Sequence, residues 1–503
     1  MFDLGKIGEF FKKNFKRKDL LIALGLIALY FLTRLINIDK FPIFCDEGIY
    51  IHWAKIAWHD ATWRFVSLTD GRQPLQTWVT IPFLKLFPAN ALFAGRLFSV
   101  ASGFVGFIGL TSFIYYLFGK KAALYGAIFY LFTPYFLFYD RMALADSAVN
   151  ASFIWILFFS ILLANSLRLD LALIFGLGGG LSLLTKSSVK LFLALAVFAP
   201  ILFWEKNKRK FFKKLLNYIF LYFIVIGIAF AFYNVQRLSP FLHFVVEKNK
   251  TFILTYNEFF KNPLSVLPYN LKAVPIYSFW EMGFALGFLG LFGLLVMFKK
   301  DRKLFFYFLI WTIVPYLVVA SFARVLFPRY IIFFASLMAV LTTYLFISLK
   351  NKRILIIFFC LYLISVAYFD YTILFDFKKI PFHPIDRGQY IEGSTAGWGM
   401  KEIVDYAREK SKEKPVIIMA EGDFGLAGDV LDVFLKPNDK VEVKGYWPLF
   451  KEDLIKNQSR LNEYQIYVVL AHYLEAPTDW PMTLIKRFDK PGNQSVTYLF
   501  QLK

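Results

Sequence analysis

Residues 41–75 read FPIFCDEGIYIHWAKIAWHDATWRFVSLTDGRQPL and directly follow the first long apolar run of the chain. Two adjacent carboxylates, Asp46 and Glu47, lie near the start of this stretch, and a basic-proline segment, Arg72-Gln73-Pro74, lies at its end. Desolvation and mutual repulsion raise the pKa of paired carboxylates at a membrane face, which suits a general base. The alternative is a helix start with Asp46 as N-cap and Glu47 in the first turn. Spacing alone leaves both interpretations open.

The composition places this stretch in a polytopic membrane protein. Of the 503 residues, 58% are hydrophobic and 20% are aromatic, which is too apolar for a soluble protein of this length. The net charge is +21, but Lys and Arg are concentrated in short loops between apolar runs, where they face anionic lipid. We therefore expect no nucleic-acid partner. The only two cysteines, Cys45 and Cys360, indicate no disulfide framework, and no metal follows from them.

Apolar runs and basic loops together predict the topology. Residues 1–19 form a basic amphipathic segment that we expect on the cytoplasmic surface. Helices 48–60 and 74–87 are expected at the outer interface. The expected membrane spans are 20–38, 93–118, 122–138, 148–167, two within 169–204 that reverse near Thr185–Ser188, 216–235, 274–297, 304–322, 325–347 and 354–375. This count of about eleven, with the N-terminus inside, puts the acid pair and the C-terminus outside.

Two further features shape the expected fold. Gly176, Gly178, Gly179 and Gly180 predict close helix packing rather than a phosphate loop, because no strand precedes them. From about residue 376 the composition indicates helices at 401–412 and 428–435, strands at 415–420 and 464–470, and a hairpin of 484–488 with 496–502. We therefore expect a transmembrane domain over residues 1–375. A small extracytoplasmic α/β domain over residues 376–503 would cover or support the site.

Five motifs in the first 210 residues resemble, in order and spacing, the membrane glycosyltransferases of the GT-C fold. They are FCDEGIYIHWAK, GRQPLQTWV, AGRLFSVASGFVG, YDRMALADSAVNASF and GLSLLTKSSVKLFL. The chain is similar to the branch that contains protein O-mannosyltransferases and the aminoarabinose transferase of lipid A. It departs from the family pattern at two places. Arg72-Gln73-Pro74 stands where Lys or His before two prolines is common, and Lys186-Ser187-Ser188 stands where Lys-Gly-Pro is usual.

The resemblance implies a glycosyltransferase that takes a hexose or pentose from a dolichyl- or undecaprenyl-type phosphate. Transfer would invert the sugar and reach a hydroxyl of a glycan, lipid or protein acceptor outside the cytoplasm, in the cell membrane or, in a eukaryote, the endoplasmic reticulum membrane. Asp46 would be the base, Glu47 would position hydroxyls, and Asp146 would be a second carboxylate. The candidate phosphate partners are Arg72, Arg96, Lys186, Arg329 and Tyr330. No cofactor is certain, and a divalent metal stays open.

Each of these assignments has a structural alternative. The alternatives are snorkelling for Arg96, a pair with Arg141 for Asp146, and interfacial anchoring for Arg329 and Tyr330. Lys186 lies between two apolar runs, where an ionisable side chain is costly, and this favours a function. For the whole protein, a lipid-linked glycan transporter is the main competitor, although the chain offers no inverted repeat. A glycan ligase or polymerase is the third possibility.

Overall fold

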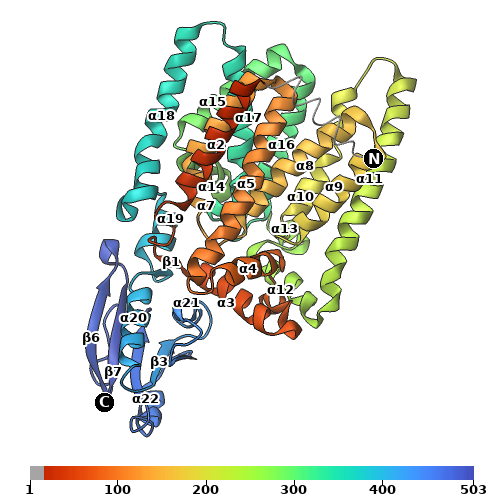
Figure 1. The fold of residues 1–503 in the computed structure, drawn as a ribbon. Helices are drawn as coiled ribbons and strands as arrows, with labels where there is room; N and C mark the ends of the chain where they lie inside the picture. Colours follow the sequence, from red (N-terminus) through yellow and green to blue (C-terminus); the bar gives the residue numbers. More distant parts are fainter. Residues whose placement is uncertain (1–15) are drawn as a thin grey trace.

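The computed structural model describes residues 16–503 as a helical bundle joined to a small sheet domain (Figure 1). The predicted cytoplasmic segment 1–19 lies almost entirely outside the described residues. The first helix of the described residues, α2 (Arg17–Leu35), covers most of the predicted span 20–38. Strand β1 (Ile43–Phe44) then leads into helix α3 (Cys45–His59) at the end of the bundle that faces the sheet domain.

The predicted interfacial helices of the first loop are present as α3 and α4 (Leu75–Leu86), with two 3₁₀ turns, η1 (Ala61–Trp63) and η2 (Val66–Asp70), between them. Helix α3 begins at Cys45, three residues earlier than predicted. The N-cap is Phe44, whose backbone N–H donates to Glu47 Oε2 at 2.9 Å. Asp46 is therefore not the N-cap, and both carboxylates lie in the first turn of the helix.

The bundle follows the predicted apolar runs, with some helices broken. Its first half contains α5 (Ala91–Phe118), α6 (Lys120–Phe132), α7 (Pro134–Tyr139), α8 (Asp146–Ser166), α9 (Leu169–Leu183), α10 (Val189–Ala196), η3 (Ala199–Phe203) and α11 (Lys208–Tyr233). The predicted run 122–138 is divided between α6 and α7 at Pro134, because proline lacks the backbone N–H that a continuous helix requires. The predicted reversal near Thr185 falls between α9 and α10.

The second half of the bundle begins after a polar loop that contains η4 (Asn234–Leu238), η5 (Pro240–Leu242), α12 (His243–Phe252) and α13 (Tyr256–Lys261). Its helices are α14 (Leu267–Glu281), α15 (Ala285–Lys300), α16 (Arg302–Phe322), η6 (Pro328–Ile331), α17 (Phe333–Ser348) and α18 (Lys352–Phe375). The predicted span over 274–297 is not one straight helix, because α14 and α15 meet at a bend of 111°. Gly283 and Phe284 adopt φ of 69° and 61° at this break, which a helix does not permit.

The predicted count of about eleven spans is not confirmed. Within residues 16–503, five helices are long and apolar enough to cross a membrane, and the bent pair α14 with α15 makes a possible sixth. Helices α9, α10 and α17 are apolar but short. The predicted close packing at the glycines is present, since a Cβ at Gly180 would lie 2.5 Å from Cβ of Phe232 on α11.

The C-terminal region folds as an α/β domain, as predicted. After η7 (Phe377–Lys379), α19 (Pro384–Arg387), η8 (Gly388–Glu392) and β2 (Ala396–Gly397), it contains α20 (Met400–Lys410), β3 (Val416–Glu421), α21 (Gly428–Phe434), β4 (Val441–Tyr446), α22 (Lys451–Gln458), β5 (Gln465–Leu470), β6 (Met482–Asp489), η9 (Pro491–Asn493) and β7 (Val496–Leu502). The strand order is β4-β3-β5-β7-β6. Strands β4, β3 and β5 are parallel, whereas β7 runs antiparallel to β5 and β6. The division of the chain at residue 375 stays a prediction.

The sheet domain is docked directly on the helix that carries the acid pair. Strand β1 pairs antiparallel with β2, with Ile43 opposite Gly397. Helix α21 packs so closely on α3 that a Cβ at Gly48 would lie 2.5 Å from Cγ2 of Val430. Glycine at position 48 therefore allows the sheet domain to approach the first turns of α3.

Candidate active site

Asp46 forms an ion pair with an arginine that lies far away in the sequence. Arg329 Nη2 is 2.9 Å from Asp46 Oδ2, and 23% of the Asp46 side chain remains exposed. Burial acts to raise the pKa of Asp46, but the positive charges of Arg329, Arg72 and Lys186 outweigh it and hold this pKa below its ordinary value. The expected increase in the pKa of Asp46 is therefore wrong, because Arg329 and its neighbours outweigh the burial of this carboxylate.

Asp146, the second predicted site carboxylate, lies at the start of α8 and contacts Lys186. Lys186 Nζ is 2.9 Å from Asp146 Oδ1 and 4.1 Å from the centre of the Tyr330 ring. The alternative pair of Asp146 with Arg141 is not present, since Arg141 donates to the backbone carbonyl of Thr33 at 2.7 Å. Lys186 and Tyr330 therefore link the α9–α10 loop to the segment that carries Arg329.

Arg72 lies beside these two pairs. Its Nε is 3.5 Å from Asp70 Oδ2, and the same carboxylate group is 2.6 Å from Lys248 Nζ of α12. The charge of Arg72 contributes to the low pKa of Asp46. Its loop turns sharply at Gly71, whose φ of +67° and close approach to the Phe244 carbonyl require glycine.

Two hydrogen bonds join the loop of Arg72 to the loop of Lys186. The backbone N–H of Leu75 donates to the Leu184 carbonyl at 3.0 Å, and Gln73 Nε2 donates to Ser187 Oγ at 2.7 Å. Gln73 and Ser187 belong to the two motifs in which this chain departs from the pattern it resembles. The departures therefore contact each other, and their hydrogen bond helps to hold Arg72 and Lys186 in one place.

These side chains form one group, which we call the charge cluster. It consists of Asp46, Arg72, Asp146, Lys186, Arg329 and Tyr330. Three cations and two carboxylates give a formal charge of 3 − 2 = +1. Asp70 and Lys248 neutralise each other at its edge. The cluster therefore has one positive charge in excess, which suits a singly charged anion.

Glu47 and Arg96 form a separate, fully buried pair. Glu47 accepts from Arg96 Nε and Nη2, both at 2.8 Å, and from the backbone N–H of Ala143 at 2.6 Å. The remaining N–H groups of Arg96 donate to backbone carbonyls of residues 38–42. All five N–H donors of Arg96 are thus used inside the protein, so neither snorkelling nor a free phosphate-binding surface fits its position. The site roles expected for Glu47 and Arg96 have no support in this arrangement.

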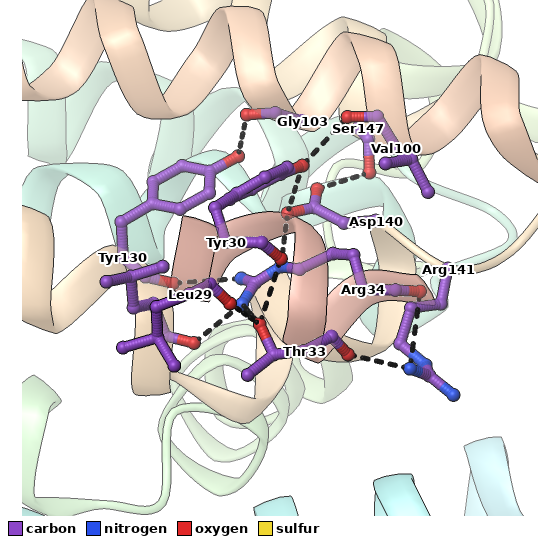
Figure 2. A network of polar contacts seen from close by, with 11 residues as sticks. Leu29, Tyr30, Thr33, Arg34, Val100, Gly103, Tyr130, Asp140, Arg141 and Ser147 are labelled. Atoms are coloured by element: carbon purple, nitrogen blue, oxygen red, sulfur yellow. Dashed lines mark hydrogen bonds and ion pairs between the residues drawn. The ribbon is translucent and has the colours of Figure 1, made fainter. Parts of the chain in front are cut away.

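A second buried network fixes the start of α8 (Figure 2). Asp140 Oδ1 accepts from Ser147 Oγ at 2.9 Å, and Asp140 Oδ2 lies 3.4 Å from Arg34 Nε. Arg34 in turn donates to the Leu131 carbonyl at 2.8 Å, and the Tyr30 hydroxyl donates to the Val100 carbonyl. Because Ser147 follows Asp146 in the chain, this network positions the first turn of α8 and its carboxylate. Sequence reasoning did not find it.

The sequence analysis also missed two polar groups near the charge cluster. Tyr50 lies one turn after Asp46, and burial raises the pKa of its hydroxyl to about 12, so the hydroxyl stays protonated and can donate. Asp386 accepts from the Tyr139 hydroxyl at 2.6 Å, and burial raises its pKa. Only the helical spacing of Tyr50 from Asp46 could have indicated its place. Within residues 16–503, no group of three or more His, Cys, Asp or Glu side chains is arranged to hold a metal ion.

Comparison with known proteins identifies the fold. ArnT from Cupriavidus metallidurans, solved with bound undecaprenyl phosphate, matches with a TM-score of 0.63 and 14% identity over 95% of this chain and 97% of ArnT. The chain has a GT-C fold. The archaeal oligosaccharyltransferase AglB from Archaeoglobus fulgidus, solved with an inhibitory peptide and a dolichol-phosphate, matches with a TM-score of 0.53 and 14% identity over 91% of this chain and 69% of AglB.

The sequence itself matches a known family over part of its length. A family model described as dolichyl-phosphate-mannose-protein mannosyltransferase matches residues 72–233. This range contains Arg72, Asp146 and Lys186 of the charge cluster. No curated protein matches the sequence. The resemblance inferred from the five motifs is thus confirmed by the GT-C fold and by this family match.

Proposed function

We propose that this protein is a membrane glycosyltransferase that moves a sugar from a polyprenyl-phosphate to an acceptor hydroxyl on the extracytoplasmic side. The observation that carries this proposal is the charge cluster, with its single excess positive charge, at the end of an apolar helical bundle. The GT-C fold, the family match and the polyprenyl phosphates named with ArnT and AglB support it. The sugar is a hexose or a pentose.

The charge of the cluster balances the charge of the phosphate both before and after sugar transfer. A sugar phosphodiester carries one negative charge, which equals the excess of the cluster in its starting state. The acceptor oxygen attacks the anomeric carbon, the bond from that carbon to the phosphate oxygen breaks, and the electron pair leaves with the phosphate. If Asp46 takes the acceptor proton, the cluster becomes +2. The phosphate becomes a monoester of charge −1.5 to −2 near pH 7. Proton transfer to Asp46 thus keeps the charges balanced, and attack opposite the leaving phosphate inverts the sugar.

The ion pairs also give the sugar donor a way to activate the base. Asp46 is a weak base while Arg329 and its neighbours hold its pKa low. A phosphate that binds Arg329, Arg72 and Lys186 shares their positive charge and raises the proton affinity of Asp46. Asp146 would hold Lys186 in position for that phosphate. Basicity at Asp46 would therefore develop only when the sugar donor is bound.

The test uses purified protein in proteoliposomes with radiolabelled sugars on undecaprenyl and dolichyl phosphate. We expect label transfer to a membrane acceptor and a rise in the donor KM for Lys186→Ala and Arg72→Ala. Arg72→Lys should recover part of the activity if charge dominates over the planar fork of arginine. Normal transfer by both alanine variants at limiting donor would remove the phosphate assignment. Movement of intact lipid-linked sugar across the bilayer without transfer would instead indicate a transporter.

A further inference from the structure

The loops that follow the parallel strands of the sheet domain lie against the first turns of α3. The loop 422–427 after β3 packs so closely that a Cβ at Gly425 would lie 2.6 Å from Sγ of Cys45, the residue before Asp46. In open α/β sheets, ligands bind outside the carboxyl ends of parallel strands. Here that edge belongs to β3, β4 and β5, and it is held next to the charge cluster.

Aromatic rings lie between the charge cluster and this edge, three in contact with one another and two as a neighbouring pair. Tyr50 and Trp53 lie one and two turns along α3 from Asp46, and their ring centres are 5.6 Å apart. Trp53 lies 6.2 Å from the ring of Phe424 in the loop after β3. Trp447 after β4 borders Gly422 and lies 5.2 Å from the ring of His472 after β5. We call these five residues the aromatic track.

The outer end of the aromatic track is open to solvent. Phe424 is 54% exposed and Trp447 is 66% exposed, whereas Trp53 is buried. The loop of Phe424 is tied to α21, because the backbone N–H of Gly425 donates to Asp429 Oδ2 at 2.7 Å. His472 is fixed as well, since its backbone N–H donates to the buried Glu421 Oε2 at 2.9 Å. Large aromatic faces that are exposed on hydrogen-bonded loops mark an interaction site.

The charges near the aromatic track select the kind of partner. Residues 422–427, 447–450 and 471–480 contain no Lys or Arg, but they contain Asp423, Glu475 and Asp479. Of these, Asp479 is paired with Lys451. Carboxylates repel the anionic headgroup of a lipid and accept hydrogen bonds from hydroxyls. Exposed aromatic rings beside hydroxyl acceptors and a histidine fit the alternating apolar faces and hydroxyl edges of sugar rings.

We propose that the aromatic track binds a saccharide acceptor, with the reacting hydroxyl beside Tyr50 and Asp46 and the rest of the glycan over Phe424 and Trp447. This inference rests on the proposed glycosyl transfer, because the track ends at the proposed base. It assigns the sheet domain a role in selecting a glycan over a peptide or a charged lipid headgroup.

The experiment measures saccharide binding to the full-length protein in nanodiscs. The probes are maltohexaose, cellohexaose, chitohexaose and α-1,6-mannohexaose, followed by saturation-transfer NMR and tryptophan fluorescence titration. A serine- and threonine-rich peptide is titrated in parallel. Binding of undecaprenyl phosphate to the same samples reports on the charge cluster independently. The variants are Phe424→Ala and Trp447→Ala, and Trp204→Ala is the control. Trp204 is 61% exposed and precedes α11, whose first turns lie at the end of the bundle far from the sheet domain (Figure 1).

We expect at least one saccharide to bind, and each track variant to weaken that binding about tenfold while Trp204→Ala leaves it unchanged. Undecaprenyl phosphate should bind equally well to all of them, which also shows that the variants fold. Three results would overturn the inference. They are no binding of any of the four saccharides, wild-type affinity for the saccharide in both Phe424→Ala and Trp447→Ala, and binding of the peptide alone. Saccharide binding without any binding of undecaprenyl phosphate would contradict the proposed function and leave the aromatic track standing.

Discussion

At the scale of single residues, the two adjacent carboxylates of α3 have different environments and therefore different expected roles. Asp46 faces the charge cluster and keeps part of its side chain exposed, whereas Glu47 is fully enclosed with Arg96. Successive residues of a helix point in directions about 100° apart, so adjacent side chains face different surroundings. The distinction between a base and a structural ion pair thus follows from one step along the helix.

Replacement of Asp46 tests its role as the base. Asp46→Asn keeps the shape of the side chain and its contact with Arg329 but removes its basicity, so turnover should fall by about 10²- to 10⁴-fold. The measurement is sugar transfer at saturating donor, with thermal unfolding of the same samples as a check on folding. Asp70→Asn is the matched control, because Asp70 has the same 23% side-chain exposure and also pairs with basic residues. Near-normal transfer by folded Asp46→Asn would remove Asp46 from the mechanism.

Replacement of Arg96 tests its assignment as a structural residue. Arg96→Met leaves Glu47 buried without its partner and should cost about 3–5 kcal/mol of unfolding free energy. The double variant Glu47→Leu with Arg96→Met should recover part of that loss, because no buried charge is then left unpaired. Denaturant unfolding in detergent measures both. A stable Arg96→Met protein with a raised donor KM would return Arg96 to the phosphate site.

The charge cluster was largely predictable by residue type, but its pairings were not. Asp46, Arg72, Asp146 and Lys186 stood in motifs within the first 210 residues, and Arg329 and Tyr330 in a short aromatic-basic segment. The pair of Asp46 with Arg329 joins residues 283 positions apart, so no local pattern contains it. The burial of Arg96 could not be predicted either, since three of its five hydrogen bonds go to backbone carbonyls of residues 38–42, and backbone carbonyls leave no mark in a sequence.

At the scale of elements, apolar runs predicted the helices well and their continuity poorly. The runs near α5, α8, α16 and α18 became single long helices. The run over 274–297 did not, because Gly283 and Phe284 leave the helical region of φ and ψ. Strand β4 (Val441–Tyr446) was missed, although its first four residues, VEVK, alternate apolar and charged side chains as a half-exposed strand does. Its parallel pairing with β3 places it at the edge of the sheet.

The contact between α9 and α11 gives a prediction at this scale. Gly180→Ala would place a Cβ 2.5 Å from Cβ of Phe232, and the two helices must separate to relieve this clash. We expect a loss of about 1–3 kcal/mol in unfolding free energy. Gly178→Ala is the control on the same helix, since its Cβ would meet only Phe159 at 3.9 Å. Equal thermal unfolding midpoints for the two variants would contradict the close packing of α9 on α11.

At the scale of the whole molecule, an ionisable contact holds the sheet domain on α3. His52 Nδ1 lies 3.0 Å from Asp432 Oδ2 and 3.7 Å from Asp429 Oδ1 of α21, and Lys55 also contacts Asp432. Burial lowers the pKa of His52, but the contact with Asp432 outweighs it, so this pKa lies above its ordinary value of 6.5. Burial raises the pKa of Asp432, but His52 and Lys55 outweigh it and lower this pKa to about 2.

The docking of the sheet domain should therefore depend on pH. The contribution of His52 is complete below pH 6.5 and is lost as pH rises through its increased folded-state pKa, whereas Asp432 stays charged down to about pH 4. Thermal unfolding from pH 5 to pH 8.5 should show that wild type loses its advantage over His52→Gln as pH rises. His59→Gln is the control, because His59 stacks on Trp58. A constant difference between wild type and His52→Gln would contradict this role.

The orientation of the whole protein in the membrane is the broadest prediction. The basic loops place the N-terminus inside, and the sheet domain with the acid pair should then lie outside. The test starts from a protein with Cys45→Ser and Cys360→Ser, since both native cysteines are free. Lys436→Cys adds one exposed thiol on the sheet domain, and Lys208→Cys adds one at the start of α11, at the far end of the bundle (Figure 1).

An impermeant maleimide should label position 436 in intact cells and position 208 only in inside-out vesicles. The two positions control for each other, because any leak would label both. Since α3 and α21 are in direct contact, the side on which position 436 is labelled is also the side of Asp46. Labelling of position 436 only in inside-out vesicles would place the charge cluster at the cytoplasmic face. An enzyme in that orientation would have to meet its acceptor inside the cell, and transfer outside the cytoplasm would be excluded.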